Sequence, residues 1–257
     1  MAGRTGEPGA SLLERAARLL AALPADGAPT ALRDLADTAG LPLSTAHRIA
    51  AELVRLGQLD RGADGRYAAG TALWELGERA PIVRRLREAA NPELTDLYDR
   101  TGENAHLAVL VPSVDGLAEV LYLARASGAR AIPTLVRVGV RHPVHATGVG
   151  RAILAVLPDA MAGPLLRAPL AQVTPFTIAD PGRLRAELAA TRERGYALTR
   201  QEMTLGNESL AMALAPRPGL PPAAIGVVTH LAGADEQRLV PLLRRAVAAI
   251  EARLDAT

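Results

Sequence analysis

Hydrophobic residues recur with the period of an α-helix between positions 30 and 67. A first helical face, with the spacing i, i+3, i+4, i+7, consists of Leu32, Leu35, Ala36 and Ala39. A second face, after the turn at Gly40, consists of Ala46, Ile49, Ala50, Leu53 and Leu56. We expect Thr30 to cap the first helix and Ser44 or Thr45 to cap the second. The pattern predicts two short helices joined by a tight turn.

Two short strand-like segments follow the second helix. They lie on either side of Ala63-Asp64-Gly65, and the whole stretch covers residues 59–67. An Asp-Gly pair between such segments is a strong signal for a β-hairpin. Two helices, a tight turn and a hairpin in this order predict a winged helix-turn-helix, a motif whose second helix enters the major groove of DNA.

The rest of the chain alternates between helical and strand-like patterns. Helices are expected at residues 11–23, 71–80, 82–102 (with a break at Asn91-Pro92), 180–194 and 235–257. Strand-like segments are expected at residues 104–111, 117–124, 132–138, 196–202, 209–215 and 223–231. Another helix should begin near residue 148. This order of elements favours an α+β fold in which helices flank one antiparallel sheet.

Four parts of the chain follow from this pattern. We predict a flexible arm at residues 1–10, a winged helix-turn-helix domain at 11–70, a linker helix at 71–80 and the sheet domain at 81–257. The first domain is helical apart from its wing, so the fold class of the whole chain is α+β.

Composition narrows the possible functions. The chain has no cysteine, which excludes disulfide scaffolds, thiolate zinc sites and cysteine nucleophiles. No apolar run reaches the ~20 residues of a membrane span. The N-terminal residues are small and polar, without the apolar region of a signal peptide. We therefore expect a cytoplasmic protein with no membrane partner.

Net charge gives no support for DNA binding. The formal charge of the chain is +2, and residues 1–79 contain nine arginines against ten acidic residues. Phosphate contacts need arginines at particular positions, however, rather than a basic domain. The candidates on the second helix and the hairpin are Ser44, Thr45, His47, Arg48, Arg61 and Arg66. Arg48 is the strongest candidate, because a guanidinium pairs bidentately with guanine O6 and N7. The alternative, an ordinary solvated surface, stays open for the two hairpin arginines.

The segment His145-Ala-Thr-Gly148 indicates a loop that enters a helix. Free N–H groups and the positive end of the helix dipole attract a carboxylate at such a point. Two alternatives stay open: Thr147 could be a plain N-cap, and His145 could tie the loop to the sheet. His142 and His145 form an i, i+3 pair, but no cysteine and no clear carboxylate partner stand beside them, so we favour a structural role over a metal site.

The chain carries no recognisable catalytic motif. The sequences G-x-S-x-G and H-E-x-x-H and a phosphate-binding glycine loop are all absent. We therefore expect no enzymatic activity, no catalytic residue and no cofactor.

Four blocks of sequence carry a resemblance to a known family. They are GLPLSTAHRIAAELVRLGQL with its wing DGRYAAG, then TGENAHLAVL, then VGVRHPVHATGVGRAILAVLP, and then RERGYALTRQEMTLGNESLAMALAP followed by AAIGVVTHLAG. In these blocks, which occur in the family's order, the chain resembles the IclR-type bacterial transcriptional regulators from about residue 11 to 254. The resemblance implies a winged helix-turn-helix joined to a GAF-like domain for effector binding and oligomerisation.

The resemblance also implies the partners. These are double-stranded, pseudo-palindromic operator DNA, a small carboxylate or aromatic-acid effector, and further copies of the chain in a homodimer or a dimer of dimers. The positions that match effector-contacting segments of the family are His145, Thr147, Gly148, Thr199, Glu202 and Ser209. The alternative hypothesis is a small-molecule-binding or catalytic domain whose winged helix unit mediates protein–protein contacts.

Overall fold

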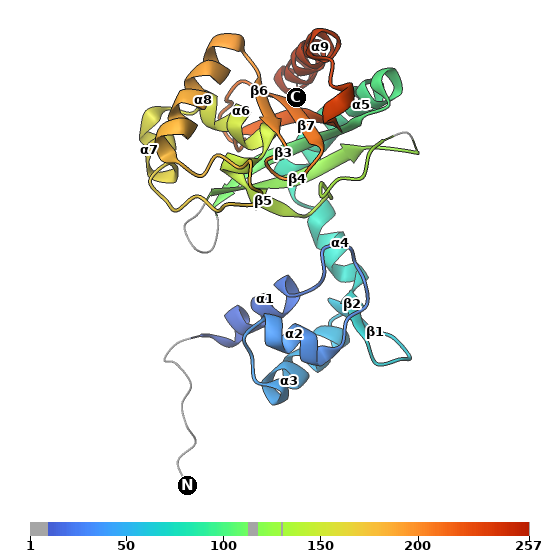
Figure 1. Ribbon diagram of the computed structural model, residues 1–257. Coiled ribbons are helices and arrows are strands. Elements are labelled where there is room, and N and C mark those ends of the chain that lie inside the picture. Colours follow the sequence, from blue (N-terminus) through green and yellow to red (C-terminus); the bar gives the residue numbers. More distant parts are fainter. Residues whose placement is uncertain (1–9, 113–117, 130, 257) are drawn as a thin grey trace. The chain divides into compact units, whose positions relative to one another are not determined.

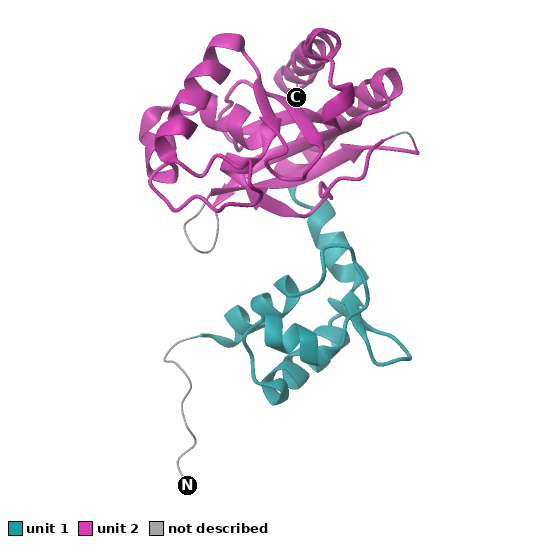
Figure 2. Cartoon of the chain, in the orientation of Figure 1, with its two compact units in different colours: residues 1–80 teal, residues 81–257 magenta. Residues whose placement is uncertain are grey.

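The computed structural model describes residues 10–112, 118–129 and 131–256 and has an α+β fold. The chain divides into two compact units, residues 1–80 and 81–257 (Figure 2). The first is helical with one small hairpin, and the second is an antiparallel sheet with helices (Figure 1). The fold class predicted from the sequence is therefore confirmed.

The first unit has the elements of a winged helix-turn-helix. They are α1 (Leu12–Ala21), α2 (Leu32–Thr38), α3 (Leu43–Arg55), β1 (Leu59–Arg61), β2 (Tyr67–Ala69) and α4 (Thr71–Glu78). Ser11 caps α1 by accepting a hydrogen bond from the N–H of Glu14 (3.1 Å). Gly40 has a φ of +64°, a left-handed conformation that glycine adopts without strain, so the chain turns sharply between α2 and α3.

Two predicted helix caps in this unit are wrong. The N-cap of α2 is Ala31 rather than Thr30. Thr30 instead exchanges two backbone hydrogen bonds of 2.8 Å with Tyr67, so this segment adds a third extended strand segment to the wing. The N-cap of α3 is Pro42, which places Ser44 and Thr45 inside the first turn of the helix instead of at its cap.

The second unit is built on a six-stranded sheet in which every neighbouring pair is antiparallel. The strands are β3 (Asn104–Pro112), β4 (Ala118–Ala126), β5 (Arg141–Pro143), β6 (Ala197–Arg200), β7 (Asn207–Ala213) and β8 (Ala223–His230). Their order in the sheet is β5-β4-β3-β8-β7-β6. β3 and β8, distant in sequence, are therefore the two central strands.

Helices cover both faces of this sheet. One face carries α5 (Pro81–Thr101) and α9 (Glu236–Asp255), and the other carries α6 (Gly148–Val156), α7 (Asp159–Leu165) and α8 (Pro181–Arg194) (Figure 1). Short 3₁₀ turns at Val144–Ala146 and Leu231–Gly233 precede α6 and α9. Alternate strand residues therefore supply two separate apolar cores, one on each face.

Two predictions for the second unit are wrong. Residues 132–138 form no strand; the short strand β5 after them pairs with β4 instead, through Glu119, Val120 and Leu121. The break predicted at Asn91-Pro92 is absent, and α5 continues through the proline. Pro92 and Glu88 are both exposed, so water can reach the carbonyl oxygen that lacks its intrahelical donor. The sequence pattern also gives no indication of α7.

Candidate DNA-binding surface and effector pocket

Exposed polar side chains occupy the N-terminal half of α3. Its buried face consists of Ala46, Ile49, Ala50 and Leu53. Ser44, His47 and Arg48 are exposed, and Thr45 is half-buried. The packing of α3 on the core of the first unit thus presents to solvent the polar residues expected from the sequence.

Arg48 is free to bind another molecule. It makes no hydrogen bond or ion pair with any residue in the described part of the chain, whereas Arg55 on the same helix pairs with Glu52 (2.8 Å). No internal hydrogen bond or ion pair therefore has to break before this guanidinium contacts guanine or phosphate.

The two hairpin arginines are exposed but held in place. The guanidinium of Arg61 lies over the ring of Tyr67, 5.6 Å from its centroid. Arg66 donates a hydrogen bond to the carbonyl oxygen of Pro29 (3.3 Å) and lies 3.7 Å from the carboxylate of Asp64. These contacts fix the wing relative to the start of α2 and leave donors available to a DNA backbone.

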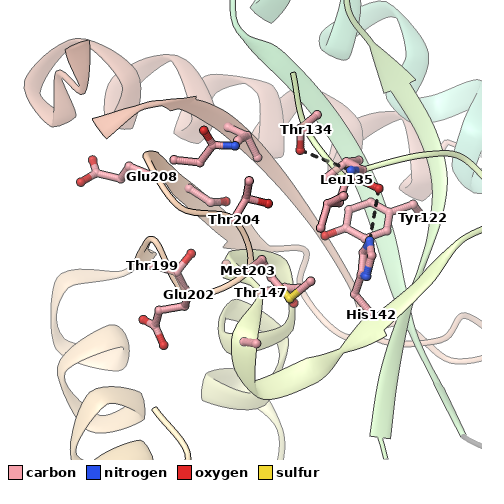
Figure 3. Close-up of a pocket in the computed structure, with 16 residues that line it drawn as sticks. Tyr122, Thr134, Leu135, His142, Thr147, Thr199, Glu202, Met203, Thr204 and Glu208 are labelled. Carbon is pink, nitrogen blue, oxygen red and sulfur yellow. Dashed lines mark hydrogen bonds between the residues drawn. The ribbon is translucent and has the colours of Figure 1, made fainter. Parts of the chain in front are cut away.

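A cavity in the second unit brings together residues from segments that lie far apart in the sequence. It contains about 420 Å³ of space free of protein atoms, partly open to solvent. Its walls are the start of α6, Tyr122 of β4, His142 of β5, the irregular segment 134–136, and the strands β6 to β8 with the loop that joins β6 and β7 (Figure 3). The segment mistaken for a strand therefore forms one wall of this cavity.

Five of the six expected effector residues line the cavity: Thr147, Gly148, Thr199, Glu202 and Ser209. Sheet register explains part of this grouping, because Thr199 pairs with Ser209 and Ser209 pairs with Val228 on adjacent strands. A Cβ atom on Gly148 would lie 2.6 Å from the Ser209 hydroxyl oxygen. Glycine at position 148 thus lets the first turn of α6 approach β7 closely.

The first turn of α6 presents backbone N–H groups. The Thr147 hydroxyl accepts a hydrogen bond from the N–H of Gly150 (3.1 Å), as an N-cap does. The first intrahelical bond follows, from the N–H of Arg151 to the carbonyl oxygen of Thr147 (3.0 Å). The N–H groups of Gly148 and Val149 precede it and have no intrahelical acceptor, so they carry the partial positive charge of the helix end.

Both acidic residues of the lining are paired with arginines. Glu202 forms a bidentate ion pair with Arg151, in which one N–O distance is 2.7 Å, and it also accepts a hydrogen bond from the N–H of Ile178 (2.9 Å). Glu208 pairs with Arg200 (2.6 Å), and its side chain points away from the cavity (Figure 3). Each of these two carboxylates is therefore neutralised by an arginine, although Oε1 of Glu208 has no hydrogen-bond partner.

His145, the sixth expected effector residue, lies elsewhere. Its Nε2 atom is 2.9 Å from the carbonyl oxygen of Ala171, and its side chain lines a different cavity together with Pro143 and Leu165. Burial lowers the pKa of His145, and burial likewise lowers the pKa of His142. In the described residues, no group of three or more His, Cys, Asp or Glu side chains is arranged to hold a metal ion.

Sequence reasoning does not single out Tyr122 or Arg151. Tyr122 lies in a run of apolar strand residues, and its place in the cavity depends on the assembly of β4, β5 and the 134–136 segment. Arg151 did carry a signal, because it is the one charged residue in the apolar helix GVGRAILAV. A charge buried in such a run requires a partner, and here Glu202 supplies it from 51 residues away.

The two units together define a class of protein: a DNA-binding regulator with a separate domain for a small molecule. Comparison with known proteins agrees. The model of the IclR helix-turn-helix domain matches residues 12–62, and the model of the C-terminal domain of the bacterial transcriptional regulator IclR matches residues 82–252. The chain therefore belongs to the IclR family of bacterial transcriptional regulators.

Individual relatives support this assignment over the whole chain. The glycerol operon regulatory protein of Streptomyces griseus is 34% identical, with 95% of this chain and 96% of the relative covered. The HTH-type transcriptional regulator XynR of Escherichia coli is 31% identical, with 88% and 89% covered. An IclR homologue from Microbacterium hydrocarbonoxydans, whose crystal structure is a complex with 4-hydroxybenzoate, is similar at 35% identity and a TM-score of 0.85, with 96% and 100% covered.

None of the described helices is both long and apolar enough to cross a lipid bilayer. The relatives named above are regulators of transcription, and their names assign no catalytic activity to them. The hypothesis of a catalytic domain with a winged unit for protein–protein contacts is therefore not favoured.

Proposed function

We propose that this protein regulates transcription in the cytoplasm and has no enzymatic activity of its own. It binds operator DNA through the α3 surface, and a carboxylic acid causes it to release or to engage that DNA. The observation that carries the proposal is the cavity of the second unit, in which the first turn of α6 forms part of the wall and both carboxylates of the lining are paired with arginines. Such a site favours an anion. Thr147, Gly148, Thr199 and Ser209 are the proposed contacts.

The chemical class of the effector is narrowed by the lining and by one relative. Apolar walls from Leu135, Val136 and Val228 suit a hydrocarbon or aromatic body, and the helix end suits a carboxylate. A homologue at 35% identity binds 4-hydroxybenzoate. We therefore propose a small aromatic acid as effector and place His145 and Glu202 in supporting roles, because their side chains already have protein partners.

The proposal includes self-association through the first unit. Large apolar side chains stand exposed there: Leu13 of α1 is 82% exposed, and Trp74 of α4 is 69% exposed. Apolar surface of this kind is typical of an interface. A second copy of the same unit would cover it and would place two α3 helices on the two halves of a pseudo-palindrome. In this arrangement α4 would transmit the effect of the acid, by favouring one dimer geometry over another.

DNA binding is tested by a gel-shift assay with fragments from the region upstream of the protein's own gene. We expect a specific shift at moderate salt, and a loss of about 1–3 kcal/mol of specific binding free energy in Arg48→Ala for each base contact removed. The control is Arg185→Ala, which removes an exposed arginine of α8 in the second unit. No specific shift with the wild-type protein, or equal binding by wild type and Arg48→Ala, would contradict the proposed surface.

Effector binding is tested separately by thermal-shift titration. A ligand that binds the folded state raises the melting temperature, and 4-hydroxybenzoate, benzoate and aliphatic carboxylic acids are the probes. Sedimentation of the wild type and of Trp74→Glu, with Met161→Glu on α7 as the control, tests self-association. A wild-type monomer at micromolar concentration would refute the proposed dimer.

A further inference from the structure

The side chain of Tyr122 lies in the floor of the cavity and is almost completely buried. Only 2% of the residue is exposed. Its ring is held between two histidine rings: the centroid of His106 is 5.2 Å away, and that of His142 is 5.6 Å away at an edge-to-face angle of 71°. Since neighbours on both sides fix the ring, the direction of its hydroxyl is also fixed.

The hydroxyl of Tyr122 makes no hydrogen bond with the residues that the structure describes, and the residue lines the cavity. Figure 3 shows its oxygen on the cavity side of the ring. The same strand could have carried phenylalanine at this position, because the ring alone fills the space between the histidines. The oxygen is not among the fully buried side-chain atoms that lack a partner, so it reaches the open space of the cavity, where an acceptor atom of a ligand can pair with it.

The protonation state of the hydroxyl suits a donor. Burial raises the pKa of Tyr122 above its ordinary value. The neighbouring His106 is neutral near pH 7, because burial lowers its pKa to about 3. The hydroxyl therefore keeps its proton under all conditions in which the protein functions, and it can donate that proton to an anionic or neutral oxygen.

We propose that Tyr122 is a specificity-determining residue whose hydroxyl donates a hydrogen bond to an oxygen atom of the bound acid. The inference rests on the proposed function. It adds Tyr122 to the contacts already proposed at the α6 end and at the hydroxyls of Thr199 and Ser209. An effector of matching chemistry carries an oxygen acceptor, either its carboxylate or a ring hydroxyl, at the Tyr122 side of the cavity. A purely hydrocarbon ligand leaves the phenol unpaired and is rejected.

The test is calorimetric titration of the full-length protein with 4-hydroxybenzoate and with benzoate, in wild type and in Tyr122→Phe. We expect the substitution to weaken binding of at least one acid by about tenfold or more, as removal of a hydrogen bond to a charged or buried acceptor does. Equal losses for both acids would assign the contact to the carboxylate. A loss confined to 4-hydroxybenzoate would assign it to the ring hydroxyl.

A matched control removes another tyrosine hydroxyl from the same unit. Tyr196 donates a hydrogen bond to Glu236 (2.7 Å) and does not line the cavity, so Tyr196→Phe should leave both affinities unchanged. In the absence of acid, Tyr122→Phe should melt at or above the wild-type temperature, which shows that a lower affinity does not come from misfolding. Unchanged affinity for both acids in Tyr122→Phe overturns the inference alone. Failure of both acids to bind the wild type overturns the aromatic-acid effector, and this inference with it.

Discussion

The ion pair between Arg151 and Glu202 predicts a large effect from the removal of a single charge. Both side chains are buried, with 1% and 7% of their surfaces exposed. Arg151 also donates to the carbonyl oxygen of His145 (2.8 Å), and Glu202 also accepts from the N–H of Ile178 (2.9 Å). Glu202→Gln keeps the shape and one oxygen acceptor but leaves the guanidinium charged in a site with almost no access to water.

The magnitude follows from this burial. Breaking a buried pair by removing one partner costs about 3–5 kcal/mol, because the remaining charge loses its compensation. In a domain of the size of residues 81–257, each kcal/mol lowers the melting temperature by about 2–4 °C. We therefore expect Glu202→Gln to melt roughly 6–20 °C below wild type. The exposed pair of Arg84 and Glu88 on α5 supplies the control, and Glu88→Gln should cost less than about 1 kcal/mol.

A double-mutant cycle separates the pair from other effects of substitution. Arg151→Met removes the guanidinium and leaves an apolar side chain of similar length, so Glu202→Gln should cost much less in that background. Urea unfolding of the four proteins at pH 7 gives the coupling free energy, which we expect to exceed about 1.5 kcal/mol. If Glu202→Gln costs no more than Glu88→Gln, or if the coupling is near zero, the two charges do not depend on each other and the reasoning is refuted.

Three further predictions concern packing, pH and helix continuity. Gly150→Ala should destabilise by more than about 2 kcal/mol in urea unfolding, because a Cβ there would lie 2.0 Å from the carbonyl oxygen of Val144. Gly163→Ala should be neutral or stabilising, because an added Cβ would meet only the flexible Arg167 side chain, at 3.4 Å. Burial lowers the pKa of His106 to about 3, so only the unfolded chain takes up this proton between pH 6.5 and 3. The free energy of unfolding should therefore decrease by about 1.4 kcal/mol for each unit by which the pH is lowered in that window. In His106→Leu, the plot of unfolding free energy against pH should be shallower by that amount. Pro92→Ala should raise the melting temperature, since it restores a missing hydrogen bond of α5; an unchanged or lower value would mean that Pro92 packs favourably.

The elements of the first unit could be predicted because local rules determine them. The helical period of residues 32–56 predicts α2 and α3, and the Asp64-Gly65 pair predicts the hairpin. Errors arose where a residue had two possible partners. Thr30 is a good cap residue in isolation, but its backbone N–H and carbonyl groups instead pair with those of Tyr67 in the wing. Local preference loses to tertiary hydrogen bonding when both compete for the same backbone groups.

The second unit could be predicted less well because its strands depend on distant partners. Residues 132–138 have the composition of a strand, but a strand needs a neighbour, and it is β5 that pairs with the edge of β4, at Glu119–Leu121. A proline near the middle of a helical pattern usually marks a break. Pro92 lies on the solvent side of α5, however, where water can hydrogen-bond to the carbonyl oxygen that lacks its intrahelical donor. Neither outcome follows from residues within a short window of sequence.

The cavity shows most clearly what a single sequence leaves hidden. Thr147 and Gly148 could be proposed from helix-end chemistry, but the pairing of Glu202 with Arg151 spans 51 residues and could not be predicted from the sequence. Glu202 lines the cavity and neutralises an arginine beside the helix end. Because the two charges are paired, neither Glu202 nor Arg151 presents an uncompensated charge to a molecule in the cavity. The proposed preference for a carboxylate then rests on the α6 end and on neutral hydroxyls, which is why removal of the Tyr122 hydroxyl should change selectivity and removal of the Glu202 charge should change stability.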